Sequence, residues 1–246
     1  MTKPILEICA ATPSSVIAAV EGCADRVELC SALSEGGVTP SVALISFATE
    51  RIPTHVLIRP RCGDFLYNDA EKEVMISDIR TARNLGAKGI AIGALTSDGG
   101  IDLNFMRRVM YVSDGISVTF HRAFDMVREP ESALEDIISL GCNRVLTSGL
   151  AATAEQGKEK LRELAGLANG RIIIMPASGV CPENAAMILL QTGAREIHAS
   201  ASMRVRSLMQ WDGSGASMGN PAVDEFMWKE TSADIVRRLR RAIDEI

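Results

Sequence analysis

The sequence has few aromatic residues, no excess of positive charge and no long apolar run. Aromatic residues make up only 4% of the 246 residues. The 26 Lys and Arg residues against 31 Asp and Glu residues give a net charge of −5. This balance disfavours nucleic acid as a partner, because binding a phosphate backbone requires clustered basic charge. No run of about 18 apolar residues occurs, so we expect neither a transmembrane segment nor a membrane partner.

Targeting signals and paired-cysteine motifs are also missing from the sequence. The N-terminus opens Met-Thr-Lys-Pro without an apolar signal core or a small-residue cleavage site, so we expect no secretory signal peptide. None of the six cysteines forms a CxxC pair, and without a signal peptide we expect reduced thiols, most of them packed as small apolar side chains.

Short β-branched runs alternate with amphipathic helical stretches along the whole chain. The runs are mostly apolar, as expected for parallel strands covered on both faces, and span residues 5–10, 26–30, 55–60, 89–95, 117–122, 144–149, 171–179 and 196–202. Each interval between them has room for one strand and one helix. Eight such units in strict alternation predict an α/β fold, a single (β/α)8 TIM barrel in one domain over residues 1–246.

An open doubly wound sheet is the alternative architecture. That fold needs a glycine-rich fingerprint after its first strand, but here the strand runs into Cys-Ala-Ala-Thr-Pro-Ser at residues 9–14. The irregular part of the chain is a long segment after the eighth strand, residues 203–230. A loop of this length is expected to be a lid or an oligomer contact, and Trp211 favours an interface.

Polar residues gather where the predicted strands end, which is where a TIM barrel carries its active site. Candidate acid–base groups are Glu7, Glu28, His121, Asp125 and His198. Candidate anion-binding residues are Arg59, Arg61, Arg122, Ser178, Gly179, Ser200 and Ser202. Candidate metal ligands are the thiols of Cys9 and Cys30.

The first two predicted strands share a Glu-x-Cys pattern, Glu7-Ile-Cys9 and Glu28-Leu-Cys30. Residues two apart in a strand point to the same face, so each glutamate shares a face with its cysteine. We expect the two thiols to stand at one level on strands about 4.8 Å apart, a spacing compatible with Cu(I) and equally with ordinary packing. We also expect the two glutamates to form a partly buried ion network with Arg59.

The ends of the later strands bear on the chemistry of the site. None of the six lysines lies there, which excludes a Schiff-base aldolase. Gly179 precedes a helix start and offers backbone N–H groups to an anion, while Ser200 and Ser202 add hydroxyl donors. Helix entries of this kind also occur without a ligand, so both interpretations stay open.

Several segments closely resemble the CutC family of copper-homeostasis proteins. They are Leu6-Glu-Ile-Cys9, Ala24-Asp-Arg-Val-Glu-Leu-Cys30, Glu35-Gly-Gly-Val-Thr-Pro-Ser41, Ile58-Arg-Pro-Arg61 with Gly63-Asp-Phe-Leu-Tyr67, Thr119-Phe-His-Arg-Ala-Phe-Asp125, and Val145-Leu-Thr-Ser-Gly149. The resemblance implies a (β/α)8 barrel, a cytoplasmic location, a homodimer or homotetramer and a link to copper tolerance. It also implies that Cys9 and Cys30 bind copper(I), and it implies no organic cofactor.

Two functions remain open at this point. The first is a protein that binds Cu(I) through Cys9 and Cys30 and buffers or moves copper. The second is an enzyme of the isomerase or lyase class that acts at the C-terminal mouth on a small anionic substrate, for instance a phosphorylated one. The expected partner is accordingly a copper ion or a small anionic ligand.

Overall fold

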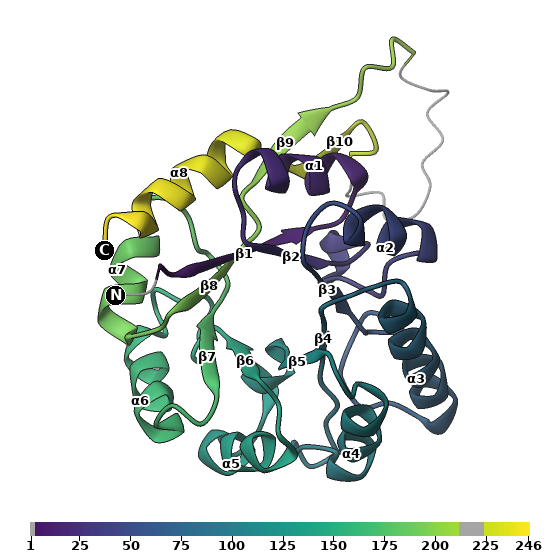
Figure 1. Cartoon of the computed structure of the whole chain (residues 1–246), viewed down its shortest axis with the longest axis vertical. Helices are drawn as coiled ribbons and strands as arrows, with labels where there is room; N and C mark the ends of the chain where they lie inside the picture. Colours follow the sequence, from purple (N-terminus) through teal and green to yellow (C-terminus); the bar gives the residue numbers. More distant parts are fainter. Residues whose placement is uncertain (1–2, 212–223) are drawn as a thin grey trace.

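Eight parallel strands form a barrel that is surrounded by helices (Figure 1). The computed structural model describes residues 3–211 and 224–246. The barrel strands are β1 (Ile5–Ala10), β2 (Arg26–Leu29), β3 (Thr54–Leu57), β4 (Gly89–Ile92), β5 (Ser117–Phe120), β6 (Arg144–Thr147), β7 (Ile173–Pro176) and β8 (Glu196–Ala199). Their hydrogen-bonded order, β7-β6-β5-β4-β3-β2-β1-β8, follows the chain around the ring and joins β1 to β8. The predicted TIM barrel is confirmed.

The structure describes eight α-helices, several of which begin or end at residues that satisfy free backbone groups. They are α1 (Pro13–Glu21), α2 (Val42–Thr49), α3 (Asp69–Asn84), α4 (Leu103–Val112), α5 (Pro130–Leu140), α6 (Lys158–Ala168), α7 (Ala185–Thr192) and α8 (Ala233–Asp244), with 3-10 turns η1 (Leu33–Glu35) and η2 (Arg122–Met126). Before α3, the Asn68 side chain accepts from the Glu71 N–H while the Glu71 carboxylate accepts from the Asn68 N–H. After α5, Gly141 takes the left-handed conformation that ends the helix.

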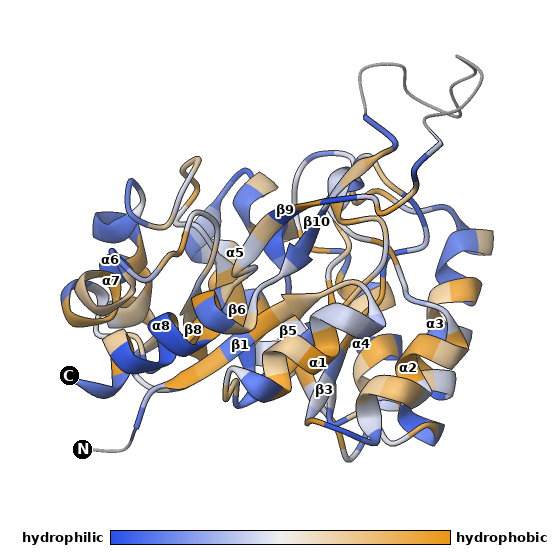
Figure 2. Ribbon diagram, turned by 90° about the horizontal axis from the view of Figure 1, so that it is seen from above, coloured by the Kyte–Doolittle hydropathy of each residue, from blue (hydrophilic) through white to orange (hydrophobic). Residues whose placement is uncertain are grey.

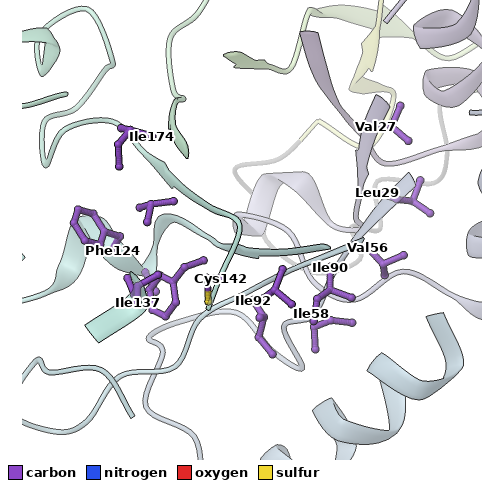
Figure 3. Packing of buried hydrophobic residues seen from close by; sticks show 14 of the residues in the cluster. Val27, Leu29, Val56, Ile58, Ile90, Ile92, Phe124, Ile137, Cys142 and Ile174 are labelled. Atoms are coloured by element: carbon purple, nitrogen blue, oxygen red, sulfur yellow. The ribbon is translucent and has the colours of Figure 1, made fainter. Parts of the chain in front are cut away.

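The apolar core lies between the barrel and the helices. Figure 3 shows Val27, Leu29 and Val56 among its packed side chains, and all three are fully buried. Burying one such side chain contributes roughly 1.5–3 kcal/mol. Because side chains alternate along a strand, Glu28, which lies between Val27 and Leu29, points to the barrel interior, and so does His55, which precedes Val56. The same packing that fixes the strands therefore directs polar groups inward.

The last helix, α8, closes the ring against α1 and α7. Figure 2 shows mostly hydrophilic residues along it, yet Val236, Leu239 and Ile243 are fully buried on its inner face. This division into two faces is what packs α8 on the barrel. Within residues 3–211 and 224–246, no helix combines the length and apolar character needed to cross a membrane.

The segment after β8 is not irregular throughout, so that prediction is wrong at both ends. Strands β9 (Ser202–Arg206) and β10 (Met227–Thr231) form an antiparallel pair. The Glu230 carboxylate accepts hydrogen bonds from Thr12 (2.6 Å) and Ser15 (2.8 Å), which fastens the pair to the start of α1. Residues 212–223, which include the Gly/Ser-rich stretch, lie outside the described residues. Each of the two strands has only five residues and a long insertion separates them, so the sequence pattern does not indicate a hairpin.

Candidate metal-binding pocket

A pocket of about 340 Å³ opens where the barrel strands end. It brings together most of the residues predicted from sequence to form a site, from strands all around the ring. Those that line it are Cys9, Glu28, Arg59, His121, Arg122, Ser178, Gly179, His198 and Ser200. Convergence of these side chains from separate strands makes this pocket the candidate functional site.

Register between the strands sets the level of each polar group in the barrel. Cys9 lies opposite Glu28, and Glu7 lies opposite Arg26 on one side and His198 on the other. Cys30 follows the end of β2 and therefore stands above Cys9. The expectation that the two thiols share one level is wrong, because the barrel's shear staggers β2 relative to β1 by two residues.

The two thiols nevertheless touch across this diagonal. Their sulfur atoms are 3.7 Å apart, and both residues are buried. With metal–sulfur bonds of about 2.3 Å, this separation corresponds to an S–metal–S angle of about 110°. Such a bent angle leaves room for further ligands on the same ion.

Two other ligand types stand beside Cys9. Its sulfur, a Glu28 carboxylate oxygen and a ring nitrogen of His198 all lie within 4.8 Å of one another. Cys9 and Glu28 are buried, and the His198 side chain is 11% exposed. Sulfur, oxygen and nitrogen atoms gathered this closely fit the ligand set of a soft or borderline metal ion.

A second carboxylate orients the imidazole of this group. Glu7 Oε1 lies 2.7 Å from His198 Nδ1 and accepts its N–H, while Glu7 Oε2 accepts from Arg26 Nε at 2.5 Å. The other ring nitrogen, Nε2, then points to Glu28, whose carboxylate is 3.7 Å away. A carboxylate behind a histidine is the usual way in which proteins orient this residue as a metal ligand.

Burial and neighbouring charges perturb the protonation of the site. Burial raises the pKa of Glu28 to about 7, the Glu7 charge adding to this and His198 and Arg26 opposing it. The pKa of Cys9 is raised by its hydrogen bond with Cys30, by burial and by the Glu28 charge. Without a metal the Cys9 thiol therefore keeps its proton at neutral pH, and a bound cation is needed to offset this.

A network of buried ions that the sequence analysis missed lies beneath the pocket. Arg26 contacts both Glu7 and Glu196 (2.5 Å each), and Arg144 also pairs with Glu196 (3.0 Å). Burial raises the pKa of Glu7, but Arg26 and then His198 outweigh this and hold it well below its usual range. The sequence does contain a signal for this network, because Arg26 lies two positions before Glu28 and Glu196 two positions before His198, on the same inward face of their strands.

Arg59 does not join this network, so the predicted pairing with Glu7 and Glu28 is wrong. Its guanidinium donates instead to the backbone carbonyls of Glu35, Gly37 and Gly63. The residue lies beyond the end of β3, where its side chain reaches the η1 loop rather than the barrel interior. Most of its donors are thus committed to shaping the rim of the pocket.

Three other predicted residues also have structural partners or lie apart from the pocket. Arg61 is not among the lining residues, and pairs with Glu71 (2.6 Å) outside it. The Asp125 carboxylate accepts from Thr147 Oγ1 at 2.5 Å, from the backbone and side chain of Ser148 and from the Leu150 N–H, so it braces the loop after β6. Ser202 lies on β9 and reaches the pocket only through its 3.3 Å contact with Ser200.

His121 lies across the ring from the thiols and is held in one orientation. Its Nδ1 accepts the Ala123 N–H (3.2 Å), and the ring packs against Phe65 with centroids 5.0 Å apart. Burial, and then the Arg59 charge, lower the pKa of His121 to about 3. The imidazole is therefore neutral at physiological pH and carries its proton on Nε2.

Comparison with known proteins matches this chain over most of its length. The sequence profile of the CutC family matches residues 4–203. The chain belongs to the CutC family. A family member of Chromobacterium violaceum is 48% identical over 98% of both chains. The human copper homeostasis protein cutC homolog is 44% identical, over 96% of this chain and 87% of its own.

A solved structure of the same family confirms the fold. The CutC copper homeostasis protein of Streptococcus agalactiae superposes with a TM-score of 0.77 and 32% sequence identity. The superposition covers 80% of this chain and 98% of the streptococcal chain. The resemblance drawn from sequence motifs to the CutC family is thereby confirmed.

Proposed function

We propose that this protein acts in copper homeostasis by binding a Cu(I) ion at the mouth of its barrel. The observation that carries the proposal is the 3.7 Å contact between the buried sulfur atoms of Cys9 and Cys30. Thiolates are the ligands that select Cu(I) among the common protein donors. The names of the human and streptococcal relatives refer to copper homeostasis, which supports the same conclusion.

His198 is the third ligand in this proposal. The bent angle imposed by the sulfur separation favours three-coordinate binding over a linear pair, and the ring nitrogen lies in the same cluster as Cys9. Imidazole also suits copper, and Glu7 holds the ring in position from behind. Glu28 then supplies a negative charge beside the ion. A cytoplasmic location belongs to the proposal, since the reduced thiols that bind copper persist in that compartment.

Competition with a chromophoric chelator under anaerobic, reducing conditions tests the proposal. We expect one Cu(I) per chain, with affinity at least 100-fold weaker in Cys9→Ser and in Cys30→Ser. Cys62→Ser is the matched control, because this thiol is exposed and is not among the residues that line the pocket. Equal affinities in all four proteins would contradict the proposal.

We further propose that the protein is a homo-oligomer and that the β9–β10 hairpin contributes to the contact. Large apolar side chains of this region face solvent: Met203, Leu208, Met209, Trp211 and Trp228. Exposed tryptophan and methionine in one region are typical of interfaces. Light scattering after size-exclusion chromatography should show a dimer or tetramer, and Trp228→Glu should lower its mass. A monomeric wild type would refute this assignment.

A further inference from the structure

The pocket is larger than a metal ion requires. Its volume of about 340 Å³ equals that of roughly ten water molecules, within the range of small-molecule sites. The thiols, Glu28 and His198 come from β1, β2 and β8. The opposite side of the ring, where β5, β6 and β7 end, contributes a different set of groups. This second set consists of hydrogen-bond donors.

His121 supplies the first donor. It is only 3% exposed, and its Nε2 atom has no hydrogen-bond partner among the described residues. Since Nδ1 already accepts the Ala123 N–H, Nε2 must carry the ring proton. Buried polar atoms are nearly always paired, so an unpaired N–H in a residue that lines a pocket indicates a missing acceptor.

The backbone after β7 supplies further donors. The last ladder bond here runs from the Ala177 N–H to the Thr147 carbonyl. Beyond it, the N–H groups of residues 178–180 have no acceptor within the part of the chain that the structure describes, and all three residues line the pocket. Successive free N–H groups in a short loop form a site that favours anions.

Arg122 adds a positive charge between these two groups. Its Nε pairs with Asp125 at 2.7 Å and one terminal nitrogen donates to Ser148, which fixes the guanidinium in place. The other terminal nitrogen, Nη1, has no acceptor in the described ranges. Because Asp125 is itself held by the loop after β6, Arg122 presents this donor in a fixed direction.

We propose that His121 Nε2, Arg122 Nη1 and the N–H groups of residues 178–180 bind the phosphoryl group of a small phosphorylated compound. The donors come from the ends of β5 and β7 and form three separate groups, which matches the three terminal oxygens of a phosphate monoester better than the planar pair of a carboxylate. A neutral histidine donor beside one arginine and backbone N–H groups can bind a dianion without titrating near neutral pH. The remainder of the compound then extends toward the Cys9 side of the same pocket.

Isothermal titration of metal-free protein at pH 7 with glycerol 3-phosphate tests this site, with inorganic phosphate and succinate as comparison ligands. We expect saturable binding of both phosphates and none of succinate. His121→Asn, whose Oδ1 can still accept the Ala123 N–H, and Arg122→Gln should each weaken binding at least tenfold. Arg61→Gln is the matched control and should bind as the wild type does, because Arg61 lies outside the pocket. Circular dichroism verifies that each variant is folded.

The outcomes separate this proposal from copper binding. Cys30→Ser should lose Cu(I) affinity and keep phosphate affinity, because its sulfur is not among the proposed phosphate donors. In spectra of 15N-labelled protein, glycerol 3-phosphate should shift the amides of residues 178–180. Failure of both phosphates to bind, tighter binding of succinate, or unchanged affinity in both pocket variants would overturn the proposal.

Discussion

Replacing His121 by asparagine should remove a cost to stability that grows as the pH falls. The asparagine carbonyl keeps the hydrogen bond from the Ala123 N–H at the start of η2, but the titratable ring is lost. Burial, and then the Arg59 charge, lower the pKa of His121 from 6.5 to about 3. Between these two pKa values the unfolded chain binds a proton that the folded protein does not. Wild-type stability therefore falls as the pH drops below 6.5.

The size of this effect follows from the two pKa values. At pH 4.5, two units below the pKa of the unfolded chain, His121 costs the wild type about 3 kcal/mol in free energy of unfolding. At pH 7.5 the cost is close to zero, because the ring is neutral in both states. The smaller asparagine leaves a cavity, but its cost is the same at both pH values and cancels from the comparison.

Urea denaturation of metal-free wild type and His121→Asn, followed by circular dichroism at pH 7.5 and pH 4.5, measures the effect. From pH 7.5 to pH 4.5, the free energy of unfolding of the variant, relative to that of the wild type, should rise by about 3 kcal/mol. His198→Asn is the contrasting control. Burial lowers the pKa of His198, but Glu28 and Glu7 together raise it above its ordinary value, so protonated His198 stabilises the fold at low pH. The free energy of unfolding of His198→Asn, relative to that of the wild type, should therefore fall between pH 7.5 and pH 4.5. A constant difference between wild type and His121→Asn would refute the reasoning.

Further experiments test the packing, the buried charges and the proposed metal site. Gly157→Ala should lower the thermal midpoint strongly, because its Cβ would lie 1.9 Å from a backbone oxygen. Gly166→Ala, whose Cβ would meet nothing within 4 Å, should stabilise α6 by about 0.5–1 kcal/mol. Equal thermal midpoints of the two variants would contradict this. Arg26→Met leaves the buried Glu7 and Glu196 without a shared partner and should cost about 3–5 kcal/mol in urea denaturation, so an unchanged midpoint would count against the network. Cu(I) affinity should fall from pH 8 to pH 6, because thiols lose protons on binding, and a flat profile in chelator competition would argue against thiolate ligands.

Much of the fold could be read from the sequence because its signals are local. The first strand was predicted with its observed bounds, Ile5–Ala10, and the other seven barrel strands begin within two residues of the predicted starts. Buried strands are apolar in themselves, and the glycine near most of the helix ends limits where the next strand begins. The hairpin after β8 escaped notice because its strands are separated by about twenty residues and neither carries a strong apolar pattern.

The candidate site was predicted less well, for a physical reason. Residue type and position at a strand end indicated Cys9, Glu28 and His198, because an inward polar group at the barrel mouth has few structural uses. Which of these groups meet depends on the stagger between strands, which no single strand encodes. That stagger paired Glu7 with Arg26 rather than with Arg59, and set the thiols on a diagonal.

The sequence alone thus determined the barrel, the end of it at which the candidate site lies and the residue types that gather there. Only the tertiary structure decided which side chains share a level and which donors are already used. Arg59, Arg61 and Asp125 have hydrogen-bond or ion-pair partners within the protein, whereas the Nε2–H of His121 has none among the described residues. Hydrogen bonds between segments far apart in the chain make these choices, and they depend on distances that a residue pattern does not contain.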